Sequence, residues 1–168
     1  GGSGGRVEKR NWNNTLLWSY DFSDSNYHQH HDIAPMPNGN LLVLCWEYKS
    51  SIDAIISGRD PSALADNELW PTYILEVEPQ GNNGINIVWE WHLWDHVVQD
   101  VDPDLPNYGV ISEHPELMDI NYGVVGDFDG MCGPQGDWIH FNAIDYNEGL
   151  DQIVLSSRYN SEIYIIDH

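Results

Sequence analysis

A repeated segment constrains the fold of this chain more than any other feature of its sequence. Residues 31–38 (HDIAPMPN) parallel residues 140–147 (HFNAIDYN), with the same spacing from the first histidine to the last asparagine. Each copy is followed by a turn, an apolar strand and a later strand that ends at an acidic residue. Recurrent units of short strands are typical of β-propeller blades, each of which is a four-stranded sheet. The repeat therefore predicts parts of more than one blade in this chain.

The rest of the sequence reads as short strands separated by turn residues, with almost no helical periodicity. Asn13-Asn14 and Asn38-Gly39 each separate two strand-like segments, and such dipeptides tolerate the positive φ of tight hairpins. Helix is expected only within residues 51–69 and around His114–Met118. The strands that we expect are residues 6–12, 15–22, 30–37, 40–47, 72–78, 86–92, 138–146, 152–158 and 162–167.

These strands predict an all-β chain that forms one partial β-propeller domain over residues 1–168, with about two and a half four-stranded blades. Residues 6–22 supply the outer two strands of one blade, residues 30–92 a full blade with an excursion, and residues 138–168 a partial blade. Residues 93–137 form a long insertion between blades, which is a candidate for shaping a site. Open blades would expose unpaired strand edges. We therefore expect the ring to be closed by the remaining blades of a longer parent chain or by self-assembly.

Charge limits the partners of this chain. Its 27 acidic residues face six basic ones, which gives a formal net charge of −21. Such a field repels nucleic acids and anionic membrane surfaces, so neither is an expected partner. No apolar run is long enough to span a membrane, so no membrane insertion is expected. An anionic substrate would require a basic residue placed against the prevailing field.

The two cysteines, Cys45 and Cys132, lie far apart and show no metal-type spacing. Cys45 stands in an apolar run, so we interpret it as a buried thiol rather than a disulfide partner. A zinc site is not expected, because the sequence contains no compact cluster of histidine, cysteine and carboxylate residues.

Acidic loops offer a weak calcium hypothesis. Asp100, Asp102 and Asp104 alternate as in calcium-binding loops, and Asp127 with Asp129 is a second candidate. The first loop, however, has Leu105 where an EF-hand requires glycine, and it lacks the glutamate at its twelfth position. Solvated acidic loops are the preferred interpretation, with bound calcium as the alternative.

The repeat also singles out candidate site residues. In a propeller the innermost strand of each blade lines the central channel, so His31 and His140 are expected to converge there. Asn142, two residues after His140, would share its face, and Arg158 ends the neighbouring strand. Two imidazoles, an amide and a guanidinium suit a tetrahedral oxyanion.

The position of His30 leaves one choice open. Because it is adjacent to His31, it should face the other side of a regular strand and support the site, but a bulge would reverse that choice. The remaining histidines, taken singly, are interpreted as structural hydrogen-bonding residues: His92, His96, His114 and His168.

Several short motifs follow one another along nearly the whole chain. They are HHDI (30–33), PNGN (37–40), VWEW (88–91), DHVVQD (95–100), NYG (107–109), HPEL (114–117), GDWIHFN (136–142), DQIVLSSR (151–158) and a terminal IDH (166–168). Together they are more specific than any one of them, and through them the chain resembles the bacterial arylsulfotransferase family.

The resemblance implies a six-bladed propeller, periplasmic or secreted, that needs neither a nucleotide sulfate donor nor a metal cofactor. It implies transfer of a sulfuryl group from an aryl sulfate donor to a phenolic acceptor through a sulfated histidine. Carried over by motif, the catalytic residues are His31, His140, Asn142 and Arg158, and the substrate-binding residues are His30 and His96.

One part of the family's site has no match here. The family's nucleophilic histidine lies in a His-Asp-Ala-Gln-like stretch of a later blade, and this chain contains no such stretch. His168 follows an outer-strand segment and does not resemble a replacement. We therefore expect the nucleophile beyond the C-terminus of this chain, and we expect the chain alone to be inactive.

A function of another class remains as the alternative. The chain could belong to a non-catalytic propeller that binds a sulfated or anionic ligand or a protein partner, with calcium stiffening its acidic loops. Propeller folds serve many functions, so the motifs and the matched histidines, rather than the fold, support the enzyme prediction.

Overall fold

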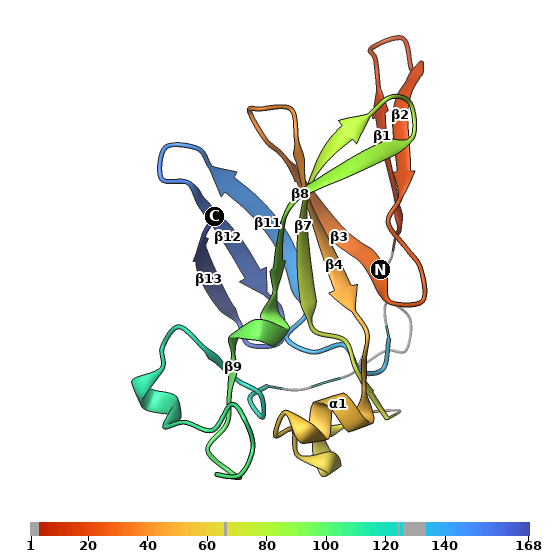
Figure 1. The fold of residues 1–168 in the computed structure, drawn as a ribbon. Coiled ribbons are helices and arrows are strands. Elements are labelled where there is room, and N and C mark those ends of the chain that lie inside the picture. Colours follow the sequence, from red (N-terminus) through yellow and green to blue (C-terminus); the bar gives the residue numbers. More distant parts are fainter. Residues whose placement is uncertain (1–3, 66, 124, 126–133) are drawn as a thin grey trace.

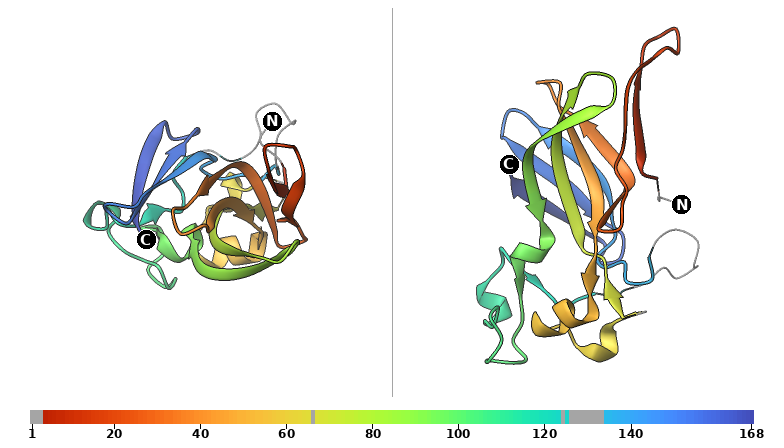
Figure 2. Two further views of the ribbon diagram at one scale, coloured as in Figure 1. Left: turned by 90° about the horizontal axis from the view of Figure 1, so that it is seen from above. Right: turned by 45° about the vertical axis from the view of Figure 1, so that its right-hand side comes forward.

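The computed structural model describes residues 4–65, 67–123, 125 and 134–168 of the chain. Strands dominate these residues, and their one α-helix is the six-residue α1 (Ser51–Ile56). The predicted all-β class is therefore confirmed. The larger sheets lie side by side, and the short helices gather at one end of them (Figures 1 and 2).

The larger sheets are antiparallel throughout. The central sheet has the order β3 (Tyr27–Pro35), β4 (Leu41–Glu47), β7 (Thr72–Gln80) and β8 (Gly84–His92). The other two are the hairpin of β1 (Arg6–Arg10) and β2 (Leu16–Asp21), and the three-stranded sheet of β11 (Phe141–Asn147), β12 (Gln152–Ser157) and β13 (Glu162–Asp167).

Short elements make up the rest of the described residues. The two-residue strands are β5 (Lys49–Ser50), paired with β6 (Glu68–Leu69), and β9 (Val97–Val98), paired with β10 (Met118–Asp119). The 3-10 helices are η1 (Pro61–Ala63), η2 (Leu93–His96) and η3 (Ile111–Glu113).

Turn residues fix the hairpins where the sequence predicts them. Asn14 has a φ of 62° between β1 and β2, and Gly39 has a φ of 92° between β3 and β4. Gly39 also donates its backbone N–H to the carbonyl of Met36, at 3.0 Å. A residue with a branched side chain would be strained at either position, so these turns set the register of the strands that follow them.

The central sheet is covered on both faces. Leu42 and Leu44 of β4 point into a core shared with β11–β13, whereas Val43 and Cys45 point into a second core shared with the β1–β2 hairpin. Every residue from Leu42 to Glu47 is buried, which explains why β4 reads as an unbroken apolar run. Cys45 is a buried free thiol, as expected, and burial raises its pKa well above the usual range.

Three sheets packed face to face in chain order is the arrangement expected of neighbouring propeller blades. The described residues do not close a ring, however. The number of blades in the natural assembly therefore stays a prediction.

A buried arginine joins the segments at the end of the sheets that carries α1 (Figure 1). The guanidinium of Arg59, 2% exposed, donates to the carbonyls of Ile120 and Ala63, the latter at 3.1 Å. It also lies over the ring of Trp138, 5.7 Å from the centroid. The segment after β4 that contains α1 and η1 is thereby held against the segment that precedes β11.

The helices differ in part from expectation. Helix forms within residues 51–69 as predicted, where Ser50 and Asp53 make a capping box at the start of α1. Around His114–Met118 the expected helix is absent, and the turn of η3 ends just before it. Pro115 disfavours a helical conformation for His114, whose φ and ψ are −124° and 66°.

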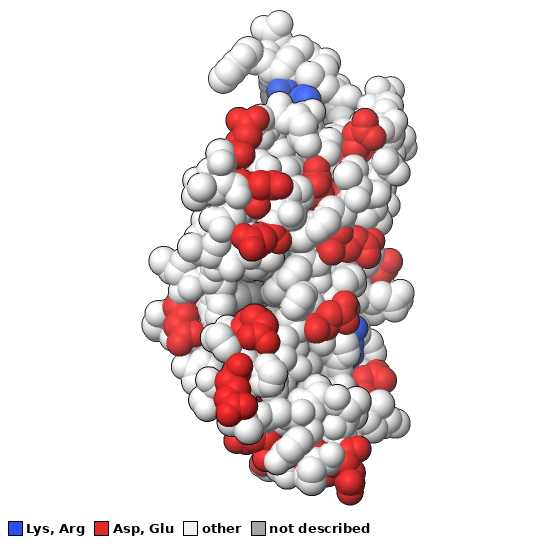
Figure 3. All heavy atoms as spheres, turned by 60° about the vertical axis from the view of Figure 1, so that its left-hand side comes forward, with Lys and Arg blue, Asp and Glu red and all other residues white. Residues whose placement is uncertain are grey.

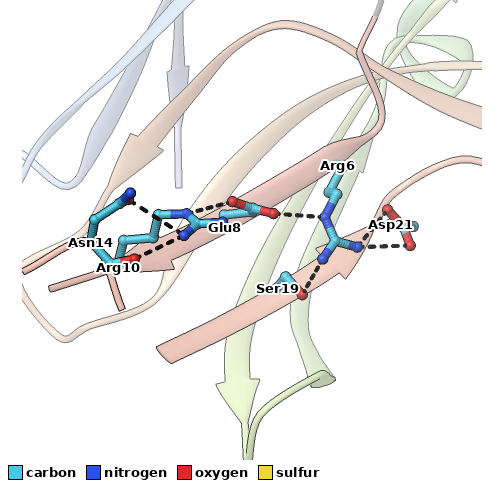
Figure 4. Close-up of polar contacts among 6 residues, drawn as sticks. All are labelled: Arg6, Glu8, Arg10, Asn14, Ser19 and Asp21. Atoms are coloured by element: carbon cyan, nitrogen blue, oxygen red, sulfur yellow. Dashed lines mark hydrogen bonds and ion pairs between the residues drawn. The ribbon is translucent and has the colours of Figure 1, made fainter. Parts of the chain in front are cut away.

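Acidic side chains are spread over the face drawn in Figure 3, and few basic ones accompany them there. On the β1–β2 hairpin, Arg6 and Arg10 both bind Glu8, at 2.9 and 2.7 Å, and Arg6 also reaches Asp21 (Figure 4). These pairs are exposed and contribute little to stability. They do neutralise two of the few cations.

A second, partly buried charge cluster lies beside β4. Glu47 accepts from Lys49 Nζ at 2.9 Å and from His92 Nδ1 at 3.1 Å, and the ring of His92 stacks on Tyr73. The hydrogen bond with Glu47 is the main cause that raises the pKa of His92 above 6.5. Protonated His92 therefore ties the end of β8 to β4.

Leu44→Ala should destabilise the chain by about 2–5 kcal/mol, because it opens a cavity in the core between two sheets. Leu44 is 0% exposed, whereas the control position, Val154, is 38% exposed. Urea unfolding followed by tryptophan fluorescence measures both variants. Equal losses for Leu44→Ala and Val154→Ala would contradict the two-sided burial of β4.

The contribution of His92 to stability should depend on pH. Since the folded pKa is raised, the contribution is complete below the unfolded pKa of about 6.5 and is lost as the pH rises through the folded value. His92→Asn should therefore cost more unfolding free energy in mildly acidic than in mildly alkaline buffer. His96→Asn is the control, because His96 makes no ion pair among the described residues. A cost independent of pH would show that the ion pair does not form.

Candidate functional site

The two repeat histidines meet between neighbouring sheets. His31 lies in β3 and His140 directly precedes β11, and their Nε2 atoms are 3.2 Å apart. Asp32 fixes the two strands beside each other, because its carboxylate accepts from the backbone N–H of Ile144 at 3.1 Å. His140 is 2% exposed, whereas His31 keeps part of its ring at the surface. The pair therefore has a buried member and an accessible one.

Both histidines have the same unusual backbone conformation. His31 has a φ of 50°, His140 a φ of 51°, and the preceding Ile139 a φ of 71°. Left-handed conformations are uncommon for residues other than glycine, and most of all for a β-branched one. The strand register shifts beside each histidine, between Gln29 and Ile33 and again between Phe141 and Ala143. The two copies of the repeat therefore share a β-bulge as well as the histidine.

The bulge in β3 brings His30 into the same cluster. His30 is 0% exposed and stacks on Trp46, with ring centroids 3.8 Å apart and an interplanar angle of 10°. Its Nδ1 lies 3.0 Å from Nδ1 of His31. The two adjacent histidines therefore do not alternate across the strand, because the irregular register rotates one of them.

Asp137 holds the buried side of the cluster. Its carboxylate is 1% exposed and accepts hydrogen bonds from His140 Nδ1 and from Trp46 Nε1, the latter at 2.8 Å. Trp46 in turn stacks on His30. One carboxylate thus positions a histidine of one sheet and the tryptophan that supports a histidine of another.

Arg158 lies beside the pair on its exposed side. Its backbone N–H donates to the carbonyl of His140 at 3.0 Å, and its guanidinium lies 5.9 Å from the ring centroid of Tyr159. The ring of Tyr159 is itself 4.9 Å from that of His140. Within the part of the chain that the structure describes, the Arg158 guanidinium makes no ion pair with a carboxylate. Its positive charge is close enough to His31 to lower the pKa of that ring.

Burial and nearby positive charge keep His30 and His31 of β3 neutral. Burial, followed by the neighbouring His140, lowers the pKa of His31 to about 4, and the Arg158 guanidinium acts in the same direction. Burial and the adjacent imidazoles hold the pKa of His30 well below 6.5. At neutral pH these rings therefore act as hydrogen-bonding groups rather than as cations.

Two predicted site residues are not brought to the histidine pair. Asn142 is exposed at the bulge of β11, so it does not share the buried face of His140, and no hydrogen bond between described residues joins it to either histidine. His96 stacks on Trp91 with ring centroids 5.1 Å apart, and it lines a separate pocket with Pro115 and Phe141. Their roles in catalysis and substrate binding stay predictions.

Sequence reasoning missed Asp137 and Trp46 as members of the cluster. Asp137 lies in the GDWIHFN motif, three residues before His140, and this motif was the available signal for it. Trp46 is separated from Asp137 by most of the chain, and the apolar run around it gave no indication of a polar contact.

No group of three or more histidine, cysteine or acidic side chains within the described ranges could hold a metal ion. The loop after β9 is organised by a side chain: Gln99 Oε1 accepts from the backbone N–H of Val101 and of Asp102, both at 2.8 Å. Asp127, Asp129 and Cys132 lie outside the described residues. No helix in the described part of the chain is long and apolar enough to cross a membrane.

Comparison with known proteins identifies the class. The family model Arylsulfotransferase (ASST) matches residues 10–168. The chain therefore belongs to the arylsulfotransferase family, which transfers sulfuryl groups between small aryl sulfates and phenols. Searches of curated proteins and of solved structures found no match.

The pKa of His31 provides a direct test of this geometry. We expect its ring to stay neutral down to a pH of about 4, as followed by the histidine carbon–proton NMR signals of the chain. Arg158→Gln should raise that pKa, because a repelling positive charge is removed, whereas Arg10→Gln, beside the turn of the β1–β2 hairpin, should not. A titration midpoint near the ordinary value of about 6.5 would contradict the packing of His31 against His140.

Proposed function

We propose that this chain forms the sulfuryl-binding part of an aryl-sulfate sulfotransferase that works through a sulfated histidine. The observation that carries the proposal is the meeting of His31 and His140, whose Nε2 atoms are 3.2 Å apart although they come from separate sheets. Arg158 lies beside them and forms no ion pair among the described residues, in a chain with a formal net charge of −21. An anion is the ligand that these groups favour together.

The reaction proceeds by two displacements at sulfur. In the first, a histidine nitrogen forms a bond to sulfur while the bond from sulfur to the aryl oxygen breaks, and the aryl oxide leaves with the electron pair and takes up a proton. In the second, a phenol loses its proton, its oxygen bonds to sulfur, and the bond between nitrogen and sulfur breaks. Splitting one transfer into two steps is the general advantage of covalent catalysis.

The residues of this chain have distinct roles in the proposal. Arg158 stabilises the negative charge that develops on the sulfuryl and leaving oxygens. His140 and His31 bind the sulfuryl oxygens, and one of them exchanges the proton with the aryl oxide and the phenol. The ring of Tyr159, 4.9 Å from His140, offers a face for the aryl group of the substrate.

Other parts of the proposal come from the family resemblance. The histidine that carries the sulfuryl group comes from strands outside this chain, and the donor is an aryl sulfate rather than a nucleotide sulfate. Asn142 adds an amide donor to the site, while His30 and His96 assist substrate binding. The enzyme works in the periplasm or outside the cell, where a strongly acidic surface keeps it soluble.

Arg158→Ala tests the site in the protein expressed from its complete natural gene. Transfer from 4-nitrophenyl sulfate to phenol, followed as nitrophenolate release, should fall on the order of 10²- to 10³-fold, as for other lost oxyanion contacts. The matched control is Arg10→Ala, whose guanidinium pairs with Glu8 on the distant hairpin. It should transfer at the wild-type rate.

The outcomes separate the candidate functions. Wild-type turnover by Arg158→Ala would overturn the site assignment. A wild-type protein that binds aryl sulfate but never releases nitrophenolate would instead identify a non-catalytic binding module.

A further inference from the structure

We propose that Asp137 is a positioning residue that fixes the proton of His140 on Nδ1 and so makes Nε2 the nitrogen that exchanges a proton in the site. The inference rests on the proposed function for its catalytic meaning. The assignment of the proton to Nδ1 follows from the contacts of the Asp137 carboxylate and does not depend on the proposed function.

The carboxylate of Asp137 determines which ring nitrogen of His140 carries a hydrogen. An ionised carboxylate accepts hydrogen bonds and cannot donate them, so the ring nitrogen that contacts it must carry the hydrogen. That nitrogen is Nδ1, and both side chains are buried, at 3% and 1% exposure. Water therefore has little access to compete for this bond. Nδ1 stays protonated whether the ring is neutral or charged.

Proton exchange by His140 is therefore confined to its other ring nitrogen. Nε2 holds a lone pair in the neutral ring and a proton in the charged ring, and it faces Nε2 of His31 at 3.2 Å. In the first displacement, Nε2–H gives its proton to the departing aryl oxide. In the second, Nε2 takes the proton of the phenol, so the site returns to its starting state.

A second donor keeps the Asp137 carboxylate in place. Trp46 Nε1 donates to Oδ1 at 2.8 Å, while His140 Nδ1 donates to Oδ2. Two donors favour the ionised form of the carboxylate and prevent rotation about its last bond. The indole N–H of Trp46 also provides a separate NMR signal that reports whether this arrangement survives a substitution.

Asp137→Asn tests the inference with little change of shape. The amide oxygen can still accept from Trp46, but the amide N–H₂ now donates to Nδ1 of His140 and expels its proton. The neutral ring should therefore change from the Nδ1–H to the Nε2–H tautomer. Imidazole ¹⁵N NMR of the 168-residue chain distinguishes the two forms, with His140→Gln used to assign the signals. Glu148→Gln, an exposed change in the following turn, is the control and should leave the tautomer unchanged.

Each outcome decides the inference. An Asp137→Asn chain that keeps the Trp46 indole signal and an Nδ1–H tautomer would overturn it. If that variant does not fold, the wild-type chain still decides, because an Nε2–H tautomer of neutral His140 in the wild type is incompatible with the proposal.

Kinetics separate this inference from the proposed function. In the protein from the complete natural gene, Asp137→Asn should lower kcat on the order of 10²-fold with KM for 4-nitrophenyl sulfate nearly unchanged, because proton transfer is lost while binding remains. Asp137→Glu, which keeps the carboxylate, should recover part of the rate. A changed tautomer in a protein without any transfer activity would refute the proposed function alone. An unchanged tautomer in an active enzyme would refute the inference alone.

Discussion

Burial of β4 on both faces is the constraint on which the rest of the structure depends. A strand with an unbroken apolar run from Leu41 to Trp46 cannot be covered by one layer, so the chain must supply a sheet on each side. The β1–β2 hairpin and the β11–β13 sheet meet this requirement. Packing β11–β13 against the central sheet is also what places His140 beside His31. The core and the site are therefore consequences of the same stacking.

The site depends on local irregularity within that regular frame. Regular alternation would have placed His30 and His31 on opposite faces of β3. The bulge instead allows His30 to stack on Trp46 while His31 contacts His140. The strained stretch of Ile139 and His140 is held by neighbours, since Ser157 Oγ donates to the carbonyl of Ile139 at 2.7 Å and Arg158 N–H to that of His140. Strain of this kind persists where the surroundings fix it, and it gathers at functional sites.

The sequence predicts regular structure better than it predicts the site. Turn dipeptides such as Asn38-Gly39 act through local backbone preference, so the strands on either side were predictable to within a few residues. The meeting of His31 and His140 was also predictable, because a repeat places equivalent residues at equivalent points of a repeated fold. Asn142 shows the limit: counting two residues along a strand assumes a regular pleat, and the bulge at Phe141 removes that regularity. The contact between Trp46 and Asp137 depends on the packing of distant segments, which no local pattern encodes.

The acidic surface has a consequence for the rate at which the site meets its ligand. An anionic donor that approaches Arg158 must cross a field of its own sign, so diffusional encounters are slowed in dilute solution. Dissolved ions shorten the reach of that field to about 8 Å at physiological ionic strength. At that ionic strength the Arg158 guanidinium still attracts a donor close to it, whereas carboxylates farther away than this distance hardly repel the donor. On the proposed function, capture of the donor should become faster as salt is added, the reverse of the behaviour of enzymes that attract their substrates by overall charge.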